Sequence, residues 1–308
     1  MATSKTKLIR TCSIWRALEL LGDKPTLLIL EAYWFGSRRF AEFCSNTGLL
    51  KTVVSNRLQK LIAAECLVKE RYSQSPIRYE YRSTEKLRTI YPIALSMLDW
   101  ERKWSDDQNK LHVDLIHNNC GKVTAPRAVC QSCRQTIDAR DVEWQEGPGI
   151  GQMQALYSRR RKSKSTPQTQ AQTVLFDVLA GIIGDRWSML IIRALFTGHS
   201  EFNEIHSDTQ IATNILSERL SFLMEQNILR KDLSKGEQRP SYKLTTRGLD
   251  IYPILLTLMA WGDQWFADEN GPPVLLKHRS CNHPLILEIA CNVCDGEVSY
   301  SNIKFELH

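Results

Sequence analysis

The sequence predicts a mainly α-helical protein of the α+β class, with two tandem domains that share one fold. Three observations predict it. A long segment is repeated, since GDKPTLLILEA at 22–32 returns as GDRWSMLIIRA at 184–194. Within each repeat, apolar residues recur at helical spacing and then give way to one alternating stretch that contains a turn. Each repeat ends in His-x-x-Cys followed by Cys-x-x-Cys, which we interpret as a short Cys-rich β-hairpin.

The repeat extends through most of the chain. TVVSNRLQKL (52–61) aligns with NILSERLSFL (214–223), and after one residue of slippage TIYPIALSMLDWERKW (89–104) aligns with DIYPILLTLMAWGDQW (250–265). A copy of roughly 120 residues is long enough to bury its own core. We therefore divide the chain into domain 1 (8–105), Cys-rich tail 1 (112–146), a linker (147–173), domain 2 (174–268) and Cys-rich tail 2 (274–308).

The composition is that of an ordinary globular protein. Of the 308 residues, 43% are hydrophobic and 24% are charged. The charged start MATSKTKLIR and the lack of a run of about 18 apolar residues predict neither a signal peptide nor a membrane span. Nine cysteines, an odd number, fit a reducing compartment, so we expect a cytoplasmic protein. A net charge of +6 is compatible with an anionic partner but does not prove one.

The stretch 147–173 has the composition of a linker. It shows no apolar periodicity, contains two prolines and three glycines, and includes the basic run Arg159–Lys164. We interpret the basic run as keeping the linker solvated and extended, in preference to a contact with a DNA backbone.

The first copy opens with two predicted helices and a helix-turn-helix. SIWRALELL (13–21) is amphipathic and ends at Gly22, and Asp23 then caps TLLILEAYWF (26–35), which is apolar nearly all round and is expected to be buried. RRFAEFCSNT (38–47) and KTVVSNRLQKLIAAE (51–65) are helices joined by a tight turn that contains Gly. Two helices connected in this way predict a helix-turn-helix.

The second helix of that motif has a polar face that suits DNA bases. At about 100° per residue, its apolar residues share one face, and the opposite face carries Thr52, Asn56 and Gln59, flanked by Ser55 and Lys60. These groups reach base edges in a major groove. Because any surface helix is polar outside, the face alone does not decide its function.

The next stretch predicts a basic wing. CLVKERYSQSPIRYEYRST (66–84) alternates and turns at Ser75-Pro76, and a closing amphipathic helix follows at 87–104, whose aromatic ridge we assign to the core or a dimer contact. A winged helix-turn-helix suits duplex DNA because the helix reads the groove while cations of the wing neutralise phosphates. In the first copy we expect DNA contacts from Lys51, Thr52, Ser55, Asn56, Arg57, Gln59, Lys60, Arg71 and Arg78.

The second copy predicts the same elements with different chemistry. Phe222 stands at the position equivalent to Lys60, and Glu218 lies on the face equivalent to that of Thr52, Asn56 and Gln59. The wing at 229–247 is more basic than the wing of the first copy. Glu218 either accepts a hydrogen bond from a cytosine amino group or marks a helix that has lost direct reading, and the sequence leaves both open. The expected contacts of this copy are Thr213, Asn214, Ser217, Glu218, Arg219, Ser221, Lys231, Lys235 and Arg239.

Both copies resemble the HxlR-type winged helix-turn-helix transcription regulators of bacteria. The resemblance rests on CSIWRALELLGDKPTLLILEA, RRFAEF and VVSNRLQKLIAAECLV in the first copy and on LAGIIGDRWSMLIIRALFTGHSEFNEI in the second. It implies a regulator, not an enzyme, that binds double-stranded DNA through helix and wing and dimerises through its terminal helices. Members usually contain one such domain and carry Trp at the position of Pro25 and Trp187. The tandem arrangement leaves open a homodimer or an intramolecular pseudo-dimer.

The resemblance also draws attention to Cys12. In some members a cysteine just ahead of the first helix senses electrophiles or oxidants, and Cys12 has that position, with Arg10 and Arg16 close in sequence. A thiol senses only where its pKa is lowered and it is exposed, which the sequence does not establish. The alternative is an inert packed thiol, which is our expectation for Cys44 and Cys66.

The two tails carry eight candidate metal ligands. Three cysteines and one histidine within one tail are sufficient for a tetrahedral zinc ion. The nine residues between the two pairs are fewer than in the usual zinc ribbon. The sequence leaves open structural zinc, an unmetallated hairpin and a redox pair, and catalytic zinc is not expected because no Glu or Asp recurs with the ligands. The ligands are His117, Cys120, Cys130 and Cys133 in tail 1, and His278, Cys281, Cys291 and Cys294 in tail 2.

Two other classes of function compete with a DNA-binding regulator. One is a winged-helix interaction scaffold with reduced DNA reading, which the face around Glu218 keeps open for the second copy. The other is a thiol-based redox protein that uses the C-x-x-C pairs, but the βαβ surroundings of such motifs are missing. The sequence therefore favours a DNA-binding transcription regulator without a membrane partner.

Overall fold

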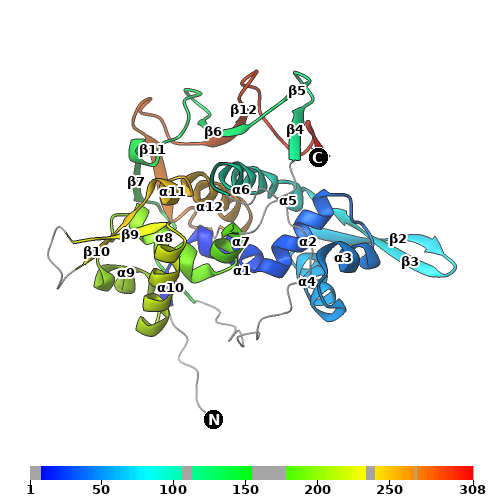
Figure 1. Cartoon of the computed structure of the whole chain (residues 1–308), viewed down its shortest axis with the longest axis horizontal. Coiled ribbons are helices and arrows are strands. Elements are labelled where there is room, and N and C mark those ends of the chain that lie inside the picture. Colours follow the sequence, from blue (N-terminus) through cyan, green and yellow to red (C-terminus); the bar gives the residue numbers. More distant parts are fainter. Residues whose placement is uncertain (1–7, 106–112, 155–177, 234–239, 268, 308) are drawn as a thin grey trace, which may run out of the picture. The chain divides into compact units, whose positions relative to one another are not determined.

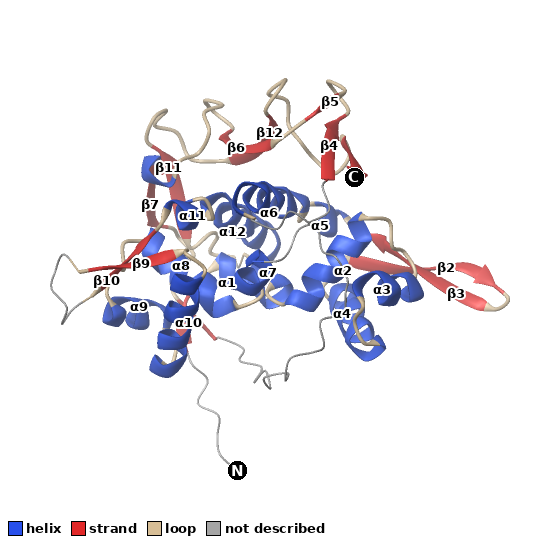
Figure 2. Cartoon of the chain, viewed as in Figure 1, coloured by secondary structure: helices blue, strands red, loops and turns tan. Residues whose placement is uncertain are grey.

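The fold combines helices with short strands, as predicted. The computed structural model describes residues 8–105, 113–154, 178–233, 240–267 and 269–307 (Figure 1). Helices make up the helix-turn-helix of each copy, and strands form the wings and the Cys-rich tails (Figure 2). No helix in these ranges is long and apolar enough to cross a membrane.

The first copy contains the predicted helix-turn-helix and wing. Gly48, with a φ of 62°, ends the first helix of the motif in the left-handed conformation that glycine adopts readily, and the chain turns there into the second helix. The hairpin turns at Ser75-Pro76, as expected. The elements are α1 (Ser13–Leu21), α2 (Lys24–Trp34), α3 (Phe40–Thr47), α4 (Lys51–Ala63), β2 (Leu67–Gln74), β3 (Ile77–Ser83), α5 (Glu85–Arg88) and α6 (Tyr91–Trp104).

The second copy repeats this order and confirms the duplicated fold. Gln210 replaces Gly48 with a φ of 54°, and its amide donates to the carbonyl of His206 at 2.8 Å, which caps the helix without glycine. The elements are α7 (Val178–Ile183), α8 (Arg186–Phe196), α9 (Phe202–Thr209), α10 (Thr213–Glu225), β9 (Leu229–Asp232), β10 (Ser241–Leu244), α11 (Thr246–Leu249) and α12 (Tyr252–Phe266).

The core of the first helix-turn-helix lies around α2. This helix is apolar nearly all round and buried, as predicted, and it packs on both α3 and α4. The inner face of α4 completes the core with Val54, Leu58 and Leu61, each at most 1% exposed. Burying three such side chains fixes the rotation of α4 about its axis, and that rotation decides which residues face solvent.

The chain forms two compact units, and each unit combines segments of both copies. Unit 1 contains Met1–Arg16, Cys130–Lys164 and Asp185–Ile286, whereas unit 2 contains Ala17–Val129, Ser165–Gly184 and Leu287–His308. The helix-turn-helix of the second copy therefore belongs to unit 1 and that of the first copy to unit 2, while parts of each tail are exchanged. This division differs from the division by copy that the sequence suggests.

The tail strands pair reciprocally between the copies. Strand β13 (Ile303–Leu307) pairs with β4 (Val113–His117) and places Ile303 opposite His117. Strand β11 (Val274–His278) pairs with β7 (Val142–Glu146) and places His278 opposite Val142. These pairs are equivalent, because His278 lies 161 residues after His117 and Ile303 lies 161 residues after Val142. The tails are thus not two independent hairpins, although β4 and β5 (Lys122–Val123) form a short hairpin in tail 1.

Four of the tail strands, β4, β6, β11 and β12, end at the first residue of a Cys or His motif. Strand β12 pairs with β6, and the 3-10 helix η1 precedes β7. The elements are β4 (Val113–His117), β5 (Lys122–Val123), β6 (Pro126–Cys130), η1 (Ala139–Asp141), β7 (Val142–Glu146), β11 (Val274–His278), β12 (Leu287–Cys291) and β13 (Ile303–Leu307).

Part of the predicted linker is folded. Strand β8 (Gln152–Gln154) pairs with β1 (Leu8–Arg10), and the amide of Gly149 donates to the carbonyl of Pro272 at 3.1 Å. A Cβ atom at Gly149 would lie 2.1 Å from the carbonyl oxygen of Gly271, so this close approach requires glycine. Strand pairing and close backbone contacts thus occur at residues 149–154, within the stretch whose composition indicated a linker. The basic run Arg159–Lys164 lies outside the described residues.

Candidate nucleic-acid interface

The polar face predicted for α4 faces solvent. Thr52, Asn56 and Gln59 are exposed along one side of the helix, Lys51 is exposed at its start, and Ser55 is half-buried beside them. The packing of Val54, Leu58 and Leu61 on the opposite side holds this face outward. The face therefore offers hydroxyl, amide and ammonium groups in one row, which are the groups that bind base edges and phosphates.

Two residues that we expected at the DNA contact are bound inside the domain. The Nε atom of Arg57 donates to Oδ1 of Asp23 at 3.0 Å, and Nζ of Lys60 donates to the carbonyls of Glu19 and Leu20, the latter at 3.2 Å. Asp23 is the N-cap of α2, and the two carbonyls lie at the end of α1. Arg57 and Lys60 thus fasten α4 to the helices behind it.

The second copy contains a pair equivalent to Arg57–Asp23. Arg219 pairs with Asp185, the N-cap of α8, and also lies 3.1 Å from Oε1 of Glu218. Glu218 is exposed and its charge is partly balanced by Arg219. The other predicted residues of α10 also face solvent, namely Thr213, Asn214, Ser217 and Ser221.

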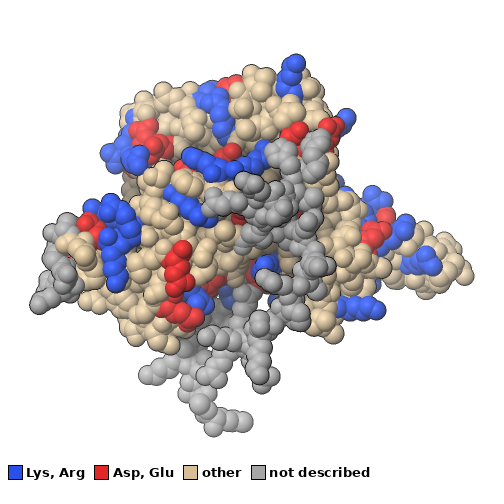
Figure 3. All heavy atoms as spheres, viewed as in Figure 1, with Lys and Arg blue, Asp and Glu red and all other residues tan. Residues whose placement is uncertain are grey.

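The first wing is basic, and some of its cations pair with acidic side chains or backbone carbonyls of the wing itself. Arg82 pairs with Glu80 and lies 3.5 Å from Glu70, and Arg71 donates to the carbonyl of Ser73 at 3.2 Å. Arg78 is exposed near the tip. Lys and Arg side chains lie on both wings, with acidic side chains among them (Figure 3). The wing thus presents cations to solvent while part of its charge is balanced internally.

The second wing is described in part. Lys231 is exposed on β9, and Lys243 on β10 pairs with Asp232. Lys235 and Arg239 lie outside the described residues.

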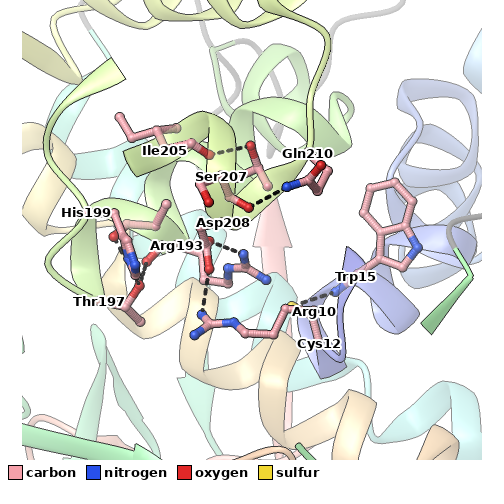
Figure 4. Close-up of polar contacts among 12 residues, drawn as sticks. Arg10, Cys12, Trp15, Arg193, Thr197, His199, Ile205, Ser207, Asp208 and Gln210 are labelled. Carbon is pink, nitrogen blue, oxygen red and sulfur yellow. Dashed lines mark hydrogen bonds and ion pairs between the residues drawn. The ribbon is translucent and has the colours of Figure 1, made fainter. Parts of the chain in front are cut away.

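Cys12 lies beside a buried ion-pair network of unit 1. Its side chain is 5% exposed, and Sγ accepts from the amide of Trp15 at 3.4 Å. Arg10 lies 3.2 Å from Asp208, which also pairs with the buried Arg193 (Figure 4). The neighbouring Cys12 and Asp208 outweigh the effect of burial and raise the pKa of the Arg193 guanidinium.

Cys12 also borders a cavity. The cavity has a volume of about 70 Å³, and Arg10 and Arg193 line it together with apolar and aromatic side chains such as Trp144, Phe196 and Tyr252. Burial does not satisfy the exposure that we expected of a sensing thiol.

The eight tail residues form two clusters that each combine both copies. Cluster 1 consists of His117, Cys120, Cys291 and Cys294, and cluster 2 of Cys130, Cys133, His278 and Cys281. Cluster 1 lies within unit 2 and cluster 2 within unit 1. The expectation of one complete ligand set per tail was wrong. Each His-x-x-Cys pair meets the Cys-x-x-Cys pair of the other copy, because the tail strands are exchanged.

The surroundings of the clusters contain residues that sequence reasoning missed. Burial raises the pKa of the Cys291 thiol, but hydrogen bonds from the Thr124 hydroxyl and the amides of Cys294 and Val293 outweigh burial and lower the pKa to about 6. Asp141 lies 3.1 Å from Nε2 of His278. No spacing in the sequence marks Thr124 or Asp141, since both reach the clusters through exchanged strands.

The sequence is similar to a family model and to several curated proteins. The family model for the HxlR-like helix-turn-helix matches residues 20–109 and 182–270. The uncharacterized HTH-type transcriptional regulator Rv3095 of Mycobacterium tuberculosis is 36% identical over 138 residues, which are 45% of this chain and 87% of that protein. The HTH-type transcriptional regulator YodB of Bacillus subtilis is 33% identical over 86 residues, 27% of this chain and 77% of that protein. A solved structure of a transcription factor candidate, PA1374 of Pseudomonas aeruginosa, is 29% identical with a TM-score of 0.31, covering 39% of this chain and 81% of that one.

Proposed function

Because the chain belongs to the HxlR-like helix-turn-helix family, we propose that it regulates transcription by binding double-stranded DNA, with α4 in the major groove and the β2–β3 wing on phosphates. Relatives in this family are named HTH-type transcriptional regulators. The proposal assigns base contacts to α4 and phosphate contacts to Lys51, Arg71 and Arg78.

One observation carries the proposal, namely the exposed row of Thr52, Asn56 and Gln59 on α4. Amide side chains such as those of Asn56 and Gln59 bind adenine through two hydrogen bonds in the major groove. The row is held outward by the buried face of α4 and by the Arg57–Asp23 pair. A rigid, correctly rotated helix is what direct reading of bases requires.

The two copies would contribute differently. On α10, Glu218 occupies the reading face and is paired with Arg219, so its carboxylate repels phosphates and tolerates only hydrogen-bond donors such as the cytosine amino group. Lys231 on β9 remains exposed for phosphate contact. We therefore assign sequence reading mainly to the first copy and a greater share of backbone contact to the wing of the second.

The exchange within one chain supports an intramolecular pseudo-dimer. Each unit contains one helix-turn-helix and takes tail strands from the other copy. The duplication places two helix-turn-helix motifs in one molecule, the number that a symmetric dimer would supply.

Binding to DNA selected from a random-sequence pool, measured across salt concentrations, tests this proposal. We expect the affinity to fall steeply as salt rises, because each neutralised phosphate releases counterions. Replacing Asn56 and Gln59 with Ala should weaken binding to the selected DNA about 10- to 100-fold and binding to random DNA much less.

The control variant replaces Gln145 on β7 and Gln152 on β8, two exposed glutamines outside both helix-turn-helix motifs, with Ala. It should bind both DNAs as the unmodified chain does. Affinity without salt dependence would contradict DNA binding, and equal losses on selected and random DNA would contradict base reading by α4.

A further inference from the structure

Four turns of the tails share one backbone geometry. Each starts at the last residue of a strand, at a Cys or His, and the amide four residues later donates to the carbonyl of that first residue. The four bonds are Gly121 to His117 at 2.7 Å, Arg134 to Cys130 at 2.8 Å, Asn282 to His278 at 2.8 Å and Asp295 to Cys291 at 3.0 Å.

The residue that closes each turn has a left-handed backbone. The φ angles are 65° at Gly121, 63° at Arg134, 63° at Asn282 and 58° at Asp295. Gly, Asn and Asp adopt this conformation more readily than other residues, whereas Arg134 does not, so the turn at Arg134 depends most on its surroundings. The tight turn directs the side chains of its first and fourth residues to the same side, where they form half of a four-ligand set.

The ligand atoms of each cluster have the separations of a tetrahedral zinc site. A zinc ion with Zn–S bonds of about 2.3 Å places two sulfurs about 3.8 Å apart. In cluster 1 the Sγ atoms of Cys120 and Cys291 lie 4.0 Å apart, and in cluster 2 those of Cys130 and Cys281 lie 3.9 Å apart. All four ligand atoms of each cluster lie within 4.8 Å of one another.

The histidines turn Nδ1 into the clusters. In cluster 1, Nδ1 of His117 lies 3.6 Å from Sγ of Cys120 and 3.3 Å from Sγ of Cys294. In cluster 2, Nδ1 of His278 lies 3.4 Å from Sγ of both Cys133 and Cys281. Both histidines are fully buried.

The outer nitrogen of His117 fixes its tautomer. Nε2 lies 3.1 Å from the carbonyl oxygen of Glu297, which can only accept, so Nε2 carries the proton and Nδ1 offers its lone pair to the cluster. Nε2 of His278 lies 3.1 Å from Oδ2 of Asp141, although its N–H is not aligned for a hydrogen bond there. A carbonyl or carboxylate behind the ring is the usual support of a histidine that binds zinc.

We propose that each cluster binds one zinc ion, so that the chain holds two structural zinc ions and each ion joins the two copies. Three cysteines and a histidine complete the tetrahedral shell, which leaves no open position for a substrate. In the bound state the three cysteines of each site are thiolates, and Zn²⁺ with three thiolates carries a net charge of −1. This assignment does not depend on whether the chain binds DNA.

Zinc content of two double variants of the full chain tests both the metal and the pairing. The chain purified under reducing conditions should contain two zinc ions. C120A with C294A removes two ligands from cluster 1 alone and should leave one zinc ion. C120A with C133A removes one ligand from each cluster and should leave none after exposure to a weak chelator.

The two variants are matched, since each replaces two cysteines with alanine. If each tail bound its own zinc ion, the results would be reversed, because Cys120 and Cys133 would share a site and Cys120 and Cys294 would not. That reversal would overturn the pairing between copies, and zinc content of zero or one in the unmodified chain would overturn the two-site proposal.

Cobalt provides a measurement that needs no substitution. Titration of the chelator-treated full chain with Co²⁺ should produce the visible absorption of tetrahedral cobalt and the sulfur-to-cobalt charge-transfer band, and both should saturate at two ions per chain. Saturation at any other number, or spectra of octahedral cobalt, would overturn the proposal. Circular dichroism of each variant shows whether a loss of metal follows from unfolding.

Discussion

At the scale of single residues, Asp23 explains why the Gly-Asp pair occurs in both copies. Its carboxylate accepts from the amide of Thr26 at 2.9 Å and from the Arg57 guanidinium at 3.0 Å. One side chain therefore caps the buried helix α2 and holds the reading helix α4. Asp185 has the same position in the second copy, where it pairs with Arg219 and accepts from the Ser188 hydroxyl but from no amide of α8.

This difference predicts unequal effects of the same substitution. Asp23→Ala should lower the free energy of unfolding by about 2 kcal/mol, because it removes a helix cap and leaves Arg57 without its partner. Asp185→Ala should lower it by about 1 kcal/mol, since only the pair and one hydroxyl bond are lost. Urea unfolding of the two variants measures the difference, and a larger loss for Asp185→Ala would contradict this role of Asp23.

The repeated stretch also differs at the position where the first copy has Pro25 and the second has Trp187, and the contacts of Trp187 give this difference a physical meaning. Its ring lies 5.3 Å from that of Trp15, centroid to centroid, within unit 1. Pro25, its equivalent, lies in the first turn of α2, where a missing amide proton does little harm. The second copy thus uses this position for aromatic packing, whereas the first uses it to start a helix.

At the scale of elements, a glutamate in the first turn stabilises the first helix of each helix-turn-helix. Oε2 of Glu42 accepts from the amides of Arg38 at 2.7 Å and Arg39 at 2.9 Å, and Glu204 binds the amides of Ser200 and Glu201 in the same way. These bonds favour the carboxylate, and the pKa of Glu42 is lowered, chiefly by the amide of Arg38 and then by that of Arg39.

The lowered pKa predicts a pH-dependent contribution to stability. The carboxylate of Glu42 should stabilise the folded chain above the ordinary pKa of 4.5, and this contribution should be lost as the pH falls through the lowered value. Glu42→Gln should therefore destabilise the chain by about 0.5 kcal/mol at pH 7 and by less near pH 3.

Urea midpoints at the two pH values provide the measurement. Glu225→Gln, at the exposed end of α10, is the matched control and should change neither midpoint. A difference between Glu42→Gln and the unmodified chain that is the same at both pH values would contradict an ionic origin.

The elements were predictable because their signals are local, whereas several site contacts were not. Helical spacing in 51–65 gave the direction of the face with Asn56 and Gln59. The same spacing placed Arg57 and Lys60 near that face without showing that Asp23 and the end of α1 lie within their reach. Periodicity gives the direction of a side chain, but its partner depends on a neighbouring helix.

At the scale of the whole molecule, the exchange of the tails could not be predicted from the sequence because the two copies are duplicates. Because the two copies carry the same motifs at the same spacing, His117 could be completed by Cys130 and Cys133 or by their equivalents Cys291 and Cys294. Composition and spacing are identical for both choices. Strand pairing decides between them, and β4 pairs with β13 of the other copy.

The exchange predicts that one copy alone should dimerise. A fragment of residues 1–154 contains β4, β6 and β7 but lacks their partners β13, β12 and β11. A second molecule of the fragment supplies equivalent strands, since β7 corresponds to β13 and β4 to β11. We expect the fragment to form a homodimer by exchange of tails.

Sedimentation velocity over a range of concentrations, with the full chain alongside, checks the assembly of the fragment. The fragment should sediment with twice its own mass. A folded, monomeric fragment would show that one copy completes its own tail and would contradict the exchange.

Because the tails are exchanged, the two halves of each cluster are synthesised at different times. Cys130 meets Cys281 across 151 residues of chain, and Cys120 meets Cys291 across 171. At about 5–20 residues per second, a ribosome needs roughly 10–30 s to produce the second partner after the first. During that interval tail 1 lacks its partner strands and cysteines, so its thiols can be oxidised and its strands can pair incorrectly. Neither cluster can be completed until tail 2 has been synthesised, because each takes two of its four residues from that tail.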